Sequence, residues 1–381
     1  MKKYLFILAT AAIVASCSNN DLRDDIQNEQ AEIGFTTFTG KLTRAGSENS
    51  GMETTHALNT HHTAFKVWGY KTVSSNATAV FGETNNAGTQ VSWNSTSSVW
   101  EYSPLRFWDK SATNYKFYAA APASANWAYA NDKISLTGFS VDGATIAASA
   151  SIDADANFGA KDIMISEDVT VEPADYTATR VQLSFIHLLT RLNIGVKKAT
   201  PALDDYVVKL TSLKVFNLVD GANFSEATAA VQSGSIARWS ANNTVSSNSK
   251  AGYGYTTETV VTTSLNYVYQ SLFIPQQIDY VANIPLNGTG LGATSKPYLN
   301  IQYSLYASDG TTLIDSYSYF YNLADMFNGA NSSDDVAFNE GWMNTLKITI
   351  EPVAINFAAD VYEWKPTTDT DVNVPDANPS N

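Results

Sequence analysis

The chain has 381 residues and a formal net charge of −14, with 23 basic against 37 acidic side chains. This acidic balance excludes proteins that bind nucleic acid through a basic surface. A single cysteine excludes an internal disulfide, and the low content of charged residues, 16%, together with abundant Thr, Ser and Tyr, favours an extracellular β protein.

The amino terminus has the composition of an export signal. Two lysines precede an apolar stretch from Tyr4 to Ala15, which is too short to remain in a bilayer as a spanning helix. The stretch leads into Val-Ala-Ser before Cys17, which resembles the lipobox of bacterial lipoproteins. We therefore expect residues 1–16 to be a lipoprotein signal peptide and Cys17 to carry an anchoring lipid. The alternative is an ordinary secreted protein that is cut close to this position.

A polar tether precedes the first strand-like segment. Residues 17–31 carry several acids and almost no apolar side chain, as a solvated link between a lipid and a fold does. Residues 33–44 then read as an edge strand with imperfect alternation, because Phe38 falls on the wrong face unless a bulge precedes it. We expect this strand to be held less tightly than a core strand.

The remainder of the chain is dominated by β patterning. Apolar and polar residues alternate with a period of two between turn-forming residues, and few stretches have the period of a helix. Segment 179–198 also fits a helix by its spacing, but its β-branched end favours strand, turn and strand. The predicted strands and hairpins span residues 64–71, 91–103, 114–122, 179–198, 206–224, 267–278, 298–323 and 343–364.

The length of the chain and one polar segment predict two domains. A chain of this size exceeds what a single hydrophobic core usually serves. The segment KKATPALDD (197–205) divides two β-rich parts of comparable length. We therefore predict an all-β protein with β-sandwich domains at residues 32–199 and 200–365, followed by a polar tail at 366–381.

The four histidines do not form a metal-binding pattern. His56, His61 and His62 lie in a polar stretch and are expected to be solvated loop residues, with adventitious metal binding as the alternative. His187 lies within an apolar strand and is expected to be a core histidine that is hydrogen-bonded to a neighbouring strand. No metal site is predicted from these residues.

One acidic loop matches a calcium-binding loop only in part. Asp153, Asp155 and Asn157 stand at alternating positions, as calcium ligands do. The glycine that such a loop requires, Gly159, comes one place late, and Met164 occupies the position of the bidentate glutamate. We therefore interpret the segment as a turn rich in hydrogen bonds between side chains and backbone.

No catalytic motif is found in the sequence. The chain has no nucleophile elbow, no zinc-protease motif and no cysteine–histidine pair, and the glycines at 288–292 lack the βαβ context of a phosphate loop. A pair of acids for glycoside hydrolysis stays open, because no spacing singles one out. We predict that the protein is not an enzyme and uses no cofactor.

Tryptophan is frequent, with eight residues in the chain. Two interpretations are open: exposed rings that stack on glycans, or rings that fill the sandwich cores, and large aromatic side chains more often fill cores. The five tryptophans of the first half are Trp68, Trp93, Trp100, Trp108 and Trp127.

Six segments in a fixed order carry a family resemblance. They are the lipobox at Cys17, the I-x-F start at Ile33 with its Thr-Arg-Ala end at Arg44, KDIMIS (161–166), VQLSFIHLLTRLNIGV (181–196), LFIPQQ (272–277), and GWMNTLKITI (341–350) before Trp364. Together these segments resemble the fimbrillin family, whose members are the lipoprotein precursors of type V pili.

The resemblance implies two tandem transthyretin-like β-sandwich domains and a route to the cell surface. It implies that Cys17 receives palmitate, that the lipoprotein reaches the outer membrane, and that an arginine-directed protease cuts between Arg44 and Ala45. Loss of the first strand then lets the subunit polymerise with other pilin subunits by donor-strand exchange. The resulting surface-exposed fimbrium mediates adhesion to a host or bacterial surface protein or glycan.

The carboxyl terminus departs from the family pattern. A donor strand should alternate apolar residues, but residues 365–381 offer only Val372 and Val374 and contain three prolines. Either the donor lies upstream within 343–364, or the protein is a tip or accessory subunit that accepts a strand without donating one. An alternative function is that of a surface glycan-binding lipoprotein that does not polymerise, and an enzyme is a third alternative that no residue pattern supports.

Overall fold

The structure, a computed structural model, describes residues 31–39, 58–60, 62–82, 86–141, 145–146, 162–173, 180–219, 221–226, 238–241, 253–255, 257–279, 297–328, 336–351 and 355–363. Within these ranges the chain is almost entirely β, with the helix α2 (Leu323–Asn328) and the 3-10 turn η1 (Leu58–Thr60) as its helical segments. The all-β prediction is confirmed. The sites expected at Cys17, Arg44, Ala45, His56, His61, Asp153, Asp155, Asn157, Gly159 and residues 288–292 lie outside the described residues, as does the tail at 366–381.

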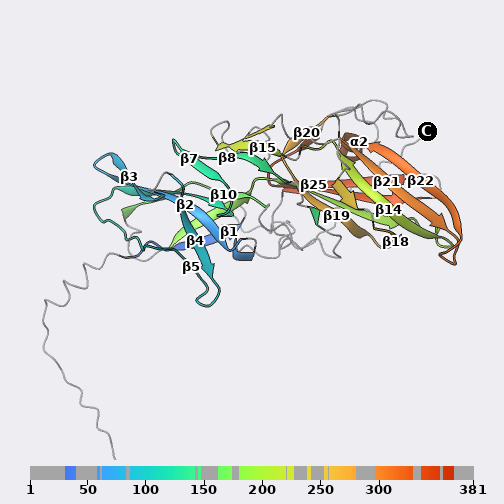
Figure 1. Ribbon diagram of the computed structural model, residues 1–381, viewed down its shortest axis with the longest axis horizontal. Helices are drawn as coiled ribbons and strands as arrows, with labels where there is room; N and C mark the ends of the chain where they lie inside the picture. Colours follow the sequence, from blue (N-terminus) through green and yellow to red (C-terminus); the bar gives the residue numbers. More distant parts are fainter. Residues whose placement is uncertain are drawn as a thin grey trace, which may run out of the picture.

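The largest sheet has nine strands and packs around an aromatic core. Its hydrogen-bonded order is β1 (Phe35–Thr39), β12 (Val181–His187), β10 (Met164–Ser166), β6 (Asn114–Ala121), β2 (Ala64–Val73), β4 (Thr89–Asn94) and β5 (Val99–Glu101), with β11 (Val169–Val171) on β6 and β3 (Asn76–Phe81) on β2. Figure 1 shows its strands β1 to β5 and β10 in one half of the molecule. Although β1 and β5 end this path, the indole nitrogen of Trp100 on β5 donates a 3.0 Å hydrogen bond to the hydroxyl of Thr37 on β1. The sheet therefore bends far enough to bring its first and last strands together.

Two further sheets pack face to face around a second core. One contains β25 (Ile355–Glu363), β24 (Trp342–Ile350), β13 (Thr190–Lys198), β19 (Asn266–Phe273) and β9 (Thr145–Ile146) in this order. The other contains β17 (Tyr253–Tyr255), β14 (Val207–Phe216), β21 (Tyr298–Tyr306) and β22 (Leu313–Asn322), with β18 (Thr259–Val261) also on β14. Leu192 and Ile194 of β13 are fully buried in one cluster with Leu210 and Leu213 of β14. This cluster also includes apolar residues of α2 and of the short ladder between β20 (Gln276–Ile278) and β23 (Val336–Phe338).

A four-stranded sheet covers the outer face of the first sheet. Its order is β16 (Trp239–Ala241), β15 (Gly221–Ser225), β8 (Lys133–Ser140) and β7 (Trp127–Ala130). Trp127, Leu136 and Phe224 of this sheet share a core with Trp68 of β2 and Tyr118 of β6. The first sheet thus has apolar layers on both faces, because the alternate residues of its central strands face different cores.

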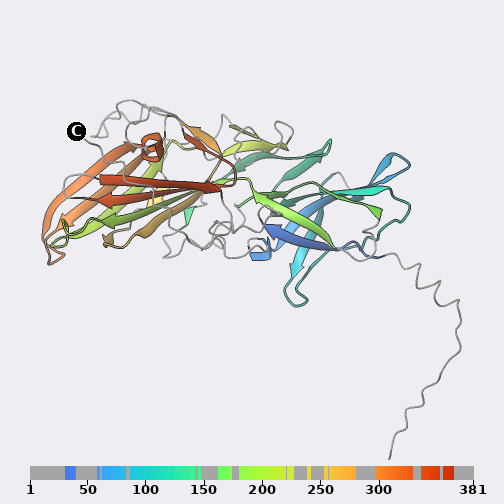
Figure 2. The same cartoon turned by 180° about the vertical axis from the view of Figure 1, so that it is seen from behind.

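Strands from the two halves of the sequence are shared between sheets (Figures 1 and 2). β15 pairs with β8 of the first half, and β9 pairs with β19 of the second half. The consecutive strands β12 and β13 belong to different sheets, so the chain passes between them at the buried residues Leu188 and Leu189. This crossing precedes the boundary expected at 199 and 200, and those domain limits stay a prediction. The two sandwiches are therefore joined by shared sheets.

Two local predictions are confirmed by the structure. The segment 179–198 contains strand, turn and strand, as its β-branched end indicated. The hairpin between β21 and β22 turns at Gly310, whose φ of 67° lies in the left-handed region that favours glycine. The side chain of Asp309 accepts backbone hydrogen bonds of 2.8 Å from Thr311 and Thr312. The hydrogen bond from the Thr312 hydroxyl has the largest effect on the pKa of Asp309, and together with the backbone hydrogen bonds it lowers this pKa to about 2.

Candidate functional site

β1 lies at the end of its sheet and pairs in parallel with β12. The register runs without a bulge over all five residues of the strand. Ile33 and Phe35 are fully buried on one face, while Phe38 is half-buried. The imperfect alternation in the sequence is therefore kept in the structure, and it places Phe38 on the opposite face.

Phe35 fills an aromatic pocket in the first core. Its ring centroid lies 6.1, 5.4, 5.8 and 5.9 Å from those of Phe65, Phe81, Tyr102 and Phe117, and all four contacts are edge-on. Burial of a phenylalanine contributes about 1.5–3 kcal/mol, and a favourable aromatic pair adds about 0.5–1.5 kcal/mol. Phe35 is thus the main side-chain anchor of β1.

The start of β1 is also held from the side opposite β12. The Ile33 amide donates to the carbonyl of Arg106 at 2.9 Å, and the Trp108 amide donates to the carbonyl of Ala31 at 3.0 Å. The Tyr102 hydroxyl donates to the Ile33 carbonyl at 2.6 Å, and burial raises the pKa of this phenol to about 12. These contacts have no signal in the sequence, because SPLRFW (103–108) lacks the alternation of a strand. The residues that lead into β1 are therefore held on both sides, and the expectation that the strand is held less tightly than a core strand stays a prediction.

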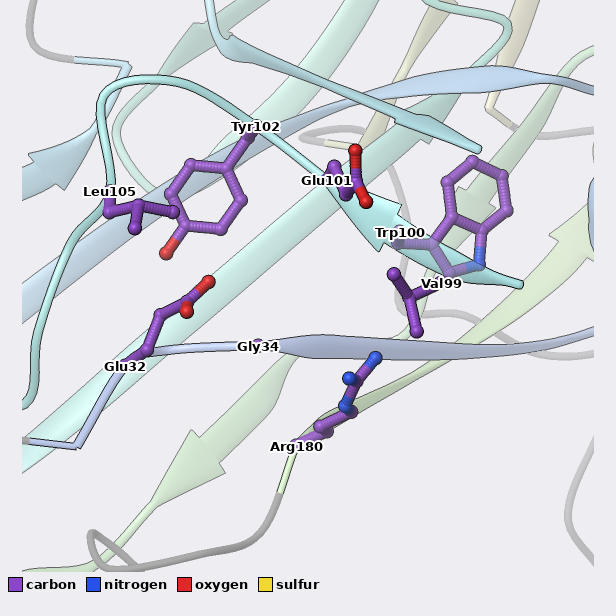
Figure 3. A pocket seen from close by; sticks show the side chains of 8 residues that line it. All are labelled: Glu32, Gly34, Val99, Trp100, Glu101, Tyr102, Leu105 and Arg180. Carbon is purple, nitrogen blue, oxygen red and sulfur yellow. The ribbon is translucent and has the colours of Figure 1, made fainter. Parts of the chain in front are cut away.

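A cavity of about 490 Å³ opens beside β1 on the side that faces β5 (Figure 3). In Figure 3 the Tyr102 hydroxyl points toward the start of β1, and Arg180 approaches Gly34. A Cβ on Gly34 would lie 3.1 Å from Cγ of Arg180, so the glycine leaves room for the arginine. The lining residues are Glu32, Gly34, Val99, Trp100, Glu101, Tyr102, Leu105 and Arg180.

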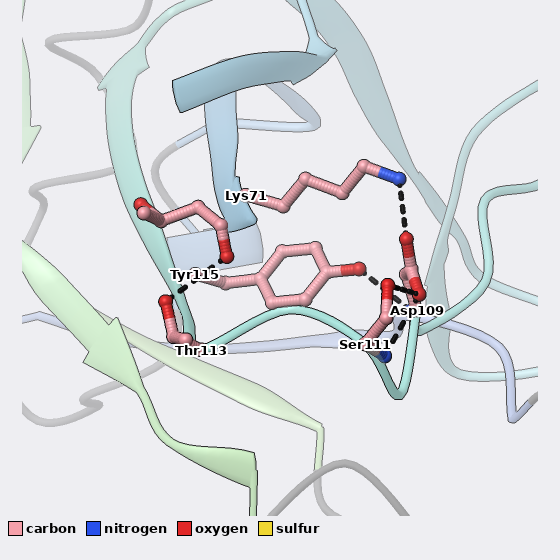
Figure 4. Close-up of polar contacts among 6 residues, drawn as sticks. Lys71, Asp109, Ser111, Thr113 and Tyr115 are labelled. Carbon is pink, nitrogen blue, oxygen red and sulfur yellow. Dashed lines mark hydrogen bonds and ion pairs between the residues drawn. The ribbon is translucent and has the colours of Figure 1, made fainter. Parts of the chain in front are cut away.

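A polar network fixes the loop that carries Trp108 (Figure 4). The Lys71 ammonium lies 2.7 Å from Oδ2 of Asp109, whose Oδ1 accepts hydrogen bonds from the amide and hydroxyl of Ser111 at 2.9 and 2.6 Å. Lys71, followed by Ser111, lowers the pKa of Asp109 to about 2. The amide of Asp109 donates to the Tyr115 hydroxyl at 2.7 Å. The loop is thereby tied to β2 and β6, which positions it against β1.

Two histidines meet at a buried aspartate near the end of β12. His187 is buried, and its Nδ1 lies 3.0 Å from Oδ1 of Asp162, which confirms the core histidine expected from the sequence. His62 is also buried and hydrogen-bonds the backbone carbonyl of Asp162 through Nε2, so the prediction of a solvated loop residue is wrong for His62. Asp162 was not singled out, although it directly precedes the apolar run IMIS. Among the described residues, no three His, Cys, Asp or Glu side chains are grouped to hold a metal ion.

The tryptophans of the described chain fill cores. Trp68, Trp100, Trp108 and Trp127 are between 0% and 6% exposed, which confirms the core interpretation for these rings. Trp93 is half-buried and packs edge-on against Trp100, with ring centroids 5.3 Å apart. No tryptophan of the described ranges is exposed, so none of them offers an open platform for stacking on a sugar.

The strand β25 begins with the same Ile-x-Phe spacing that leads into β1. It is the outer strand of its sheet and pairs with β24 along its whole length. Its sequence begins with Ile355 and Phe357 two positions apart, as Ile33 and Phe35 are at the first strand. Residues two apart share a face of a strand, so both segments present an isoleucine and a phenylalanine in the same order. Pro352, which cannot donate a ladder hydrogen bond, separates β24 from β25.

Comparison with known proteins finds a protein family that matches most of the chain. A fimbrillin-like family model matches residues 43–364. A fimbrial protein from Bacteroides vulgatus is 18% identical, with a TM-score of 0.48 over 88% of this chain and 99% of its own. A proposed cell adhesion protein from Bacteroides uniformis is 14% identical, with a TM-score of 0.41 over 88% of this chain and 98% of its own.

No curated protein matches the chain with significant similarity. Within the described residues, no helix combines the length and the apolar character needed to span a membrane. The match to the family model covers most of the sequence, from just before the expected cleavage position to the end of β25. The chain belongs to the fimbrillin-like family.

Proposed function

We propose that the protein is a non-enzymatic subunit of type V pili that is exported as a lipoprotein and assembled by donor-strand exchange. In this proposal Cys17 carries the lipid at the outer membrane, and a protease cuts between Arg44 and Ala45. The mature fibre mediates adhesion at the cell surface. Membership in the fimbrillin-like family supports the pilus role. The observation that carries the proposal is that β1, which precedes the cleavage position, is an edge strand with its anchor in the core.

A cut after Arg44 would separate β1 from the rest of the chain. Backbone hydrogen bonds to β12 and the burial of Ile33 and Phe35 would then hold the strand without a covalent link. Its departure would leave N–H and C=O groups of β12 unpaired and would empty the pocket around Phe35, both of which are unfavourable. A strand from another subunit with matching apolar residues would restore the ladder and refill the pocket.

We assign the donor to β25, which lies within the upstream segment that the sequence left open. In the matching register Ile355 takes the place of Ile33, and Phe357 takes the place of Phe35. Ala358, which is exposed, then replaces Thr36, which is also exposed. Since donor and acceptor are different surfaces of the subunit, the contact is head-to-tail and extends into a fibre. This register supports a shaft subunit over a tip subunit that only accepts a strand.

The alternative of a glycan-binding lipoprotein has less support. Its motivation was the high aromatic content, and the tryptophans of the described ranges are buried or half-buried. The aromatic residues around Phe35 and β12 instead form the seat of the exchangeable strand.

Analysis of sheared surface fibres by mass spectrometry and electron microscopy tests the proposal. Fibres whose subunits begin at Ala45 are the expected result. Arg44→Ala should keep β1 attached and abolish the fibres, whereas Arg23→Ala, upstream in the tether, should leave cleavage and fibres unchanged. Recovery of monomeric protein that begins at lipidated Cys17, without any fibres, would overturn the proposal.

A further inference from the structure

Exposed large apolar side chains gather at two places on the described surface. Groups of exposed apolar side chains mark interaction sites on soluble proteins. We call Leu105 and Phe107 the rim patch, because both lie in the loop beside the start of β1. We call four other exposed large apolar residues the tip patch. They are Tyr206 (37% exposed), Val260 (53%), Leu313 (54%) and Ile314 (50%). Val361 on β25 is also exposed and belongs to neither patch.

The tip patch lies at one end of the second sandwich. Val260 on β18 stands opposite Lys209 near the start of β14, and Tyr206 directly precedes that strand. Tyr306, at the end of β21, stands opposite Leu313 at the start of β22. Both views place β18 and the hairpin of β21 and β22 at the end of the molecule away from β1 and β5 (Figures 1 and 2).

The tip patch adjoins the point where β24 ends. The amide of Ala199 donates to the carbonyl of Ile350, the last residue of β24, at 2.9 Å. The preceding residue, Lys198, donates from its ammonium group to the carbonyl of Tyr206 at 2.8 Å. Tyr206 is therefore linked through Lys198 and Ala199 to Ile350, the end of β24, from which β25 would depart.

The rim patch adjoins the start of β1. Phe107 forms a β-bridge with Glu32, and the carbonyl of Arg106 accepts the amide hydrogen of Ile33. The proposed register gives Ile355 the place of Ile33, whose amide donates to the Arg106 carbonyl. The rim patch thus lies beside the start of the incoming strand.

The chain between the two patches is very short in the exchanged state. Ile355 of one copy would lie against the start of the acceptor groove in the next copy, while Ile350 stays at the end of β24. These two residues are five positions apart, and five residues span at most roughly 18 Å. This short connection brings the end of one subunit close to the start of the next.

Charged side chains of both signs lie beside each patch. Asp204 and Asp205 are exposed next to Tyr206, whose carbonyl accepts the hydrogen bond from Lys198. Arg180 is exposed at the cavity beside the rim, which Glu32 and Glu101 also line. No ion pair joins Asp204, Asp205 or Arg180 to another residue of the described ranges. An arginine on one surface and acids on the other form pairs that orient the two surfaces when they approach each other.

We propose that the tip patch of one copy packs against the rim patch of the next copy, as a second contact beside the exchanged strand. The inference rests on the proposed strand exchange and adds an interface that the exchange alone does not require. The partner is a second copy of this chain. The contact buries apolar side chains that are exposed in the single subunit, and it fixes the angle between consecutive subunits.

Disulfide trapping in surface fibres tests this inference. Cleavage after Arg44 removes Cys17, the single native cysteine, so introduced cysteines stand alone in the mature chain. Fibres of the full chain with Phe107→Cys and Tyr206→Cys should give a ladder of covalent dimers and higher multimers under oxidising conditions, and reductant should collapse it. The matched control combines Tyr206→Cys with Lys133→Cys, an exposed position in the four-stranded sheet, and should give no ladder.

The outcomes separate this inference from the proposed function. Fibres of the Phe107→Cys and Tyr206→Cys variant that stay free of covalent multimers would overturn the tip-to-rim contact and leave strand exchange standing. Absence of fibres from the unmodified protein would overturn both. If only the cysteine variant fails to assemble, Asp204→Arg combined with Asp205→Arg gives the second measurement. Its fibres should dissociate at a lower temperature than unmodified fibres, and unchanged dissociation would overturn the contact.

Discussion

The ring of Phe35 meets the ring of Phe81 edge-on, with centroids 5.4 Å apart and planes inclined at 70°. Phe81 belongs to β3, which shares no ladder with β1, so the contact crosses the interior of the curled sheet. The first described strand therefore contributes to the centre of the first core, although it lies at the end of its sheet.

Replacement of Phe35 by alanine should destabilise the uncut precursor by about 3–5 kcal/mol, because it leaves a cavity among four aromatic rings. Denaturant unfolding of the precursor measures this change. Thr36→Ala, at an exposed position of the same strand, should stay within about 0.5 kcal/mol of the unmodified protein. Equal stability of the two variants would contradict the anchoring role of Phe35.

Tyr102→Phe should destabilise the precursor by about 1 kcal/mol, because the Ile33 carbonyl loses its phenolic donor. Burial raises the pKa of Tyr102 from 10 to about 12, so the folded state favours the neutral phenol. The corresponding stabilisation is complete below pH 10 and is lost as the pH rises from 10 toward 12. Unfolding measured between pH 8 and 12 should therefore show a shallower alkaline decline in the variant. An unchanged alkaline decline in the variant would contradict the role of Tyr102. Tyr206→Phe, at an exposed position, is the control and should leave stability at neutral pH unchanged.

Asp109→Asn should flatten the acid dependence of stability. Lys71 and Ser111 lower the pKa of Asp109 from 3.8 to about 2. A depressed carboxyl pKa stabilises the fold above the unfolded value, and this contribution is lost as the pH falls from 3.8 toward 2. Acid titration of unfolding should show a smaller drop in the variant, and Lys71→Gln should remove part of the same drop. A wild-type acid slope in Asp109→Asn would count against the network.

Asp162→Ala should destabilise the precursor by about 1–3 kcal/mol, because the buried ring of His187 loses the carboxylate that it contacts at 3.0 Å. Thermal or denaturant unfolding at neutral pH measures the loss. Glu167→Ala, at an exposed position beyond the same short strand, should stay within about 0.5 kcal/mol. A neutral effect of Asp162→Ala would show that the His187 contact is not stabilising.

Phe357→Asp should abolish fibres while leaving cleavage after Arg44 intact, because a carboxylate cannot fill the apolar seat of Phe35. Electron microscopy and terminal sequencing of the surface protein separate the two effects. Ala358→Asp, on the exposed face of the strand, should assemble normally. Normal fibres from Phe357→Asp would reject β25 in this register as the donor.

Much of the fold follows from local pattern, and the rest depends on long-range pairing. The alternation of Val208, Leu210 and their neighbours fixes which face of β14 is buried, and the SDG turn closes the hairpin that follows. The pairing of β15 with β8 has no such signal, because short polar-flanked strands fit many partners. The parallel pairing of β1 with β12 is likewise set by the tertiary core and not by the strand's own sequence.

The strand that carries the candidate site was predicted from the sequence, but its contacts were not, and the cleavage position at Arg44 stays a prediction. The strand at Ile33 and the arginine after it were visible in the sequence. The contacts made by Tyr102, Arg106 and Trp108 were not, since the backbone donor at Trp108 and the backbone acceptor at Arg106 have no side-chain signature. His62 was misassigned for a similar reason, because its polar neighbours hid a partner one hundred positions away at Asp162.

The crossing at Leu188 and Leu189 has a mechanical consequence. β12, which pairs with β1, continues through these two residues into β13, which lies beside β24 in the sheet that β25 completes. A tensile load applied to a strand that is paired with β12 therefore passes along the chain from β12 to β13. It then reaches β25 through two hydrogen-bonded ladders, β13 with β24 and β24 with β25. Because β1 and β12 run parallel, pulling along them shears all their hydrogen bonds at once instead of opening them in turn. The subunit is thus organised to carry force along its length.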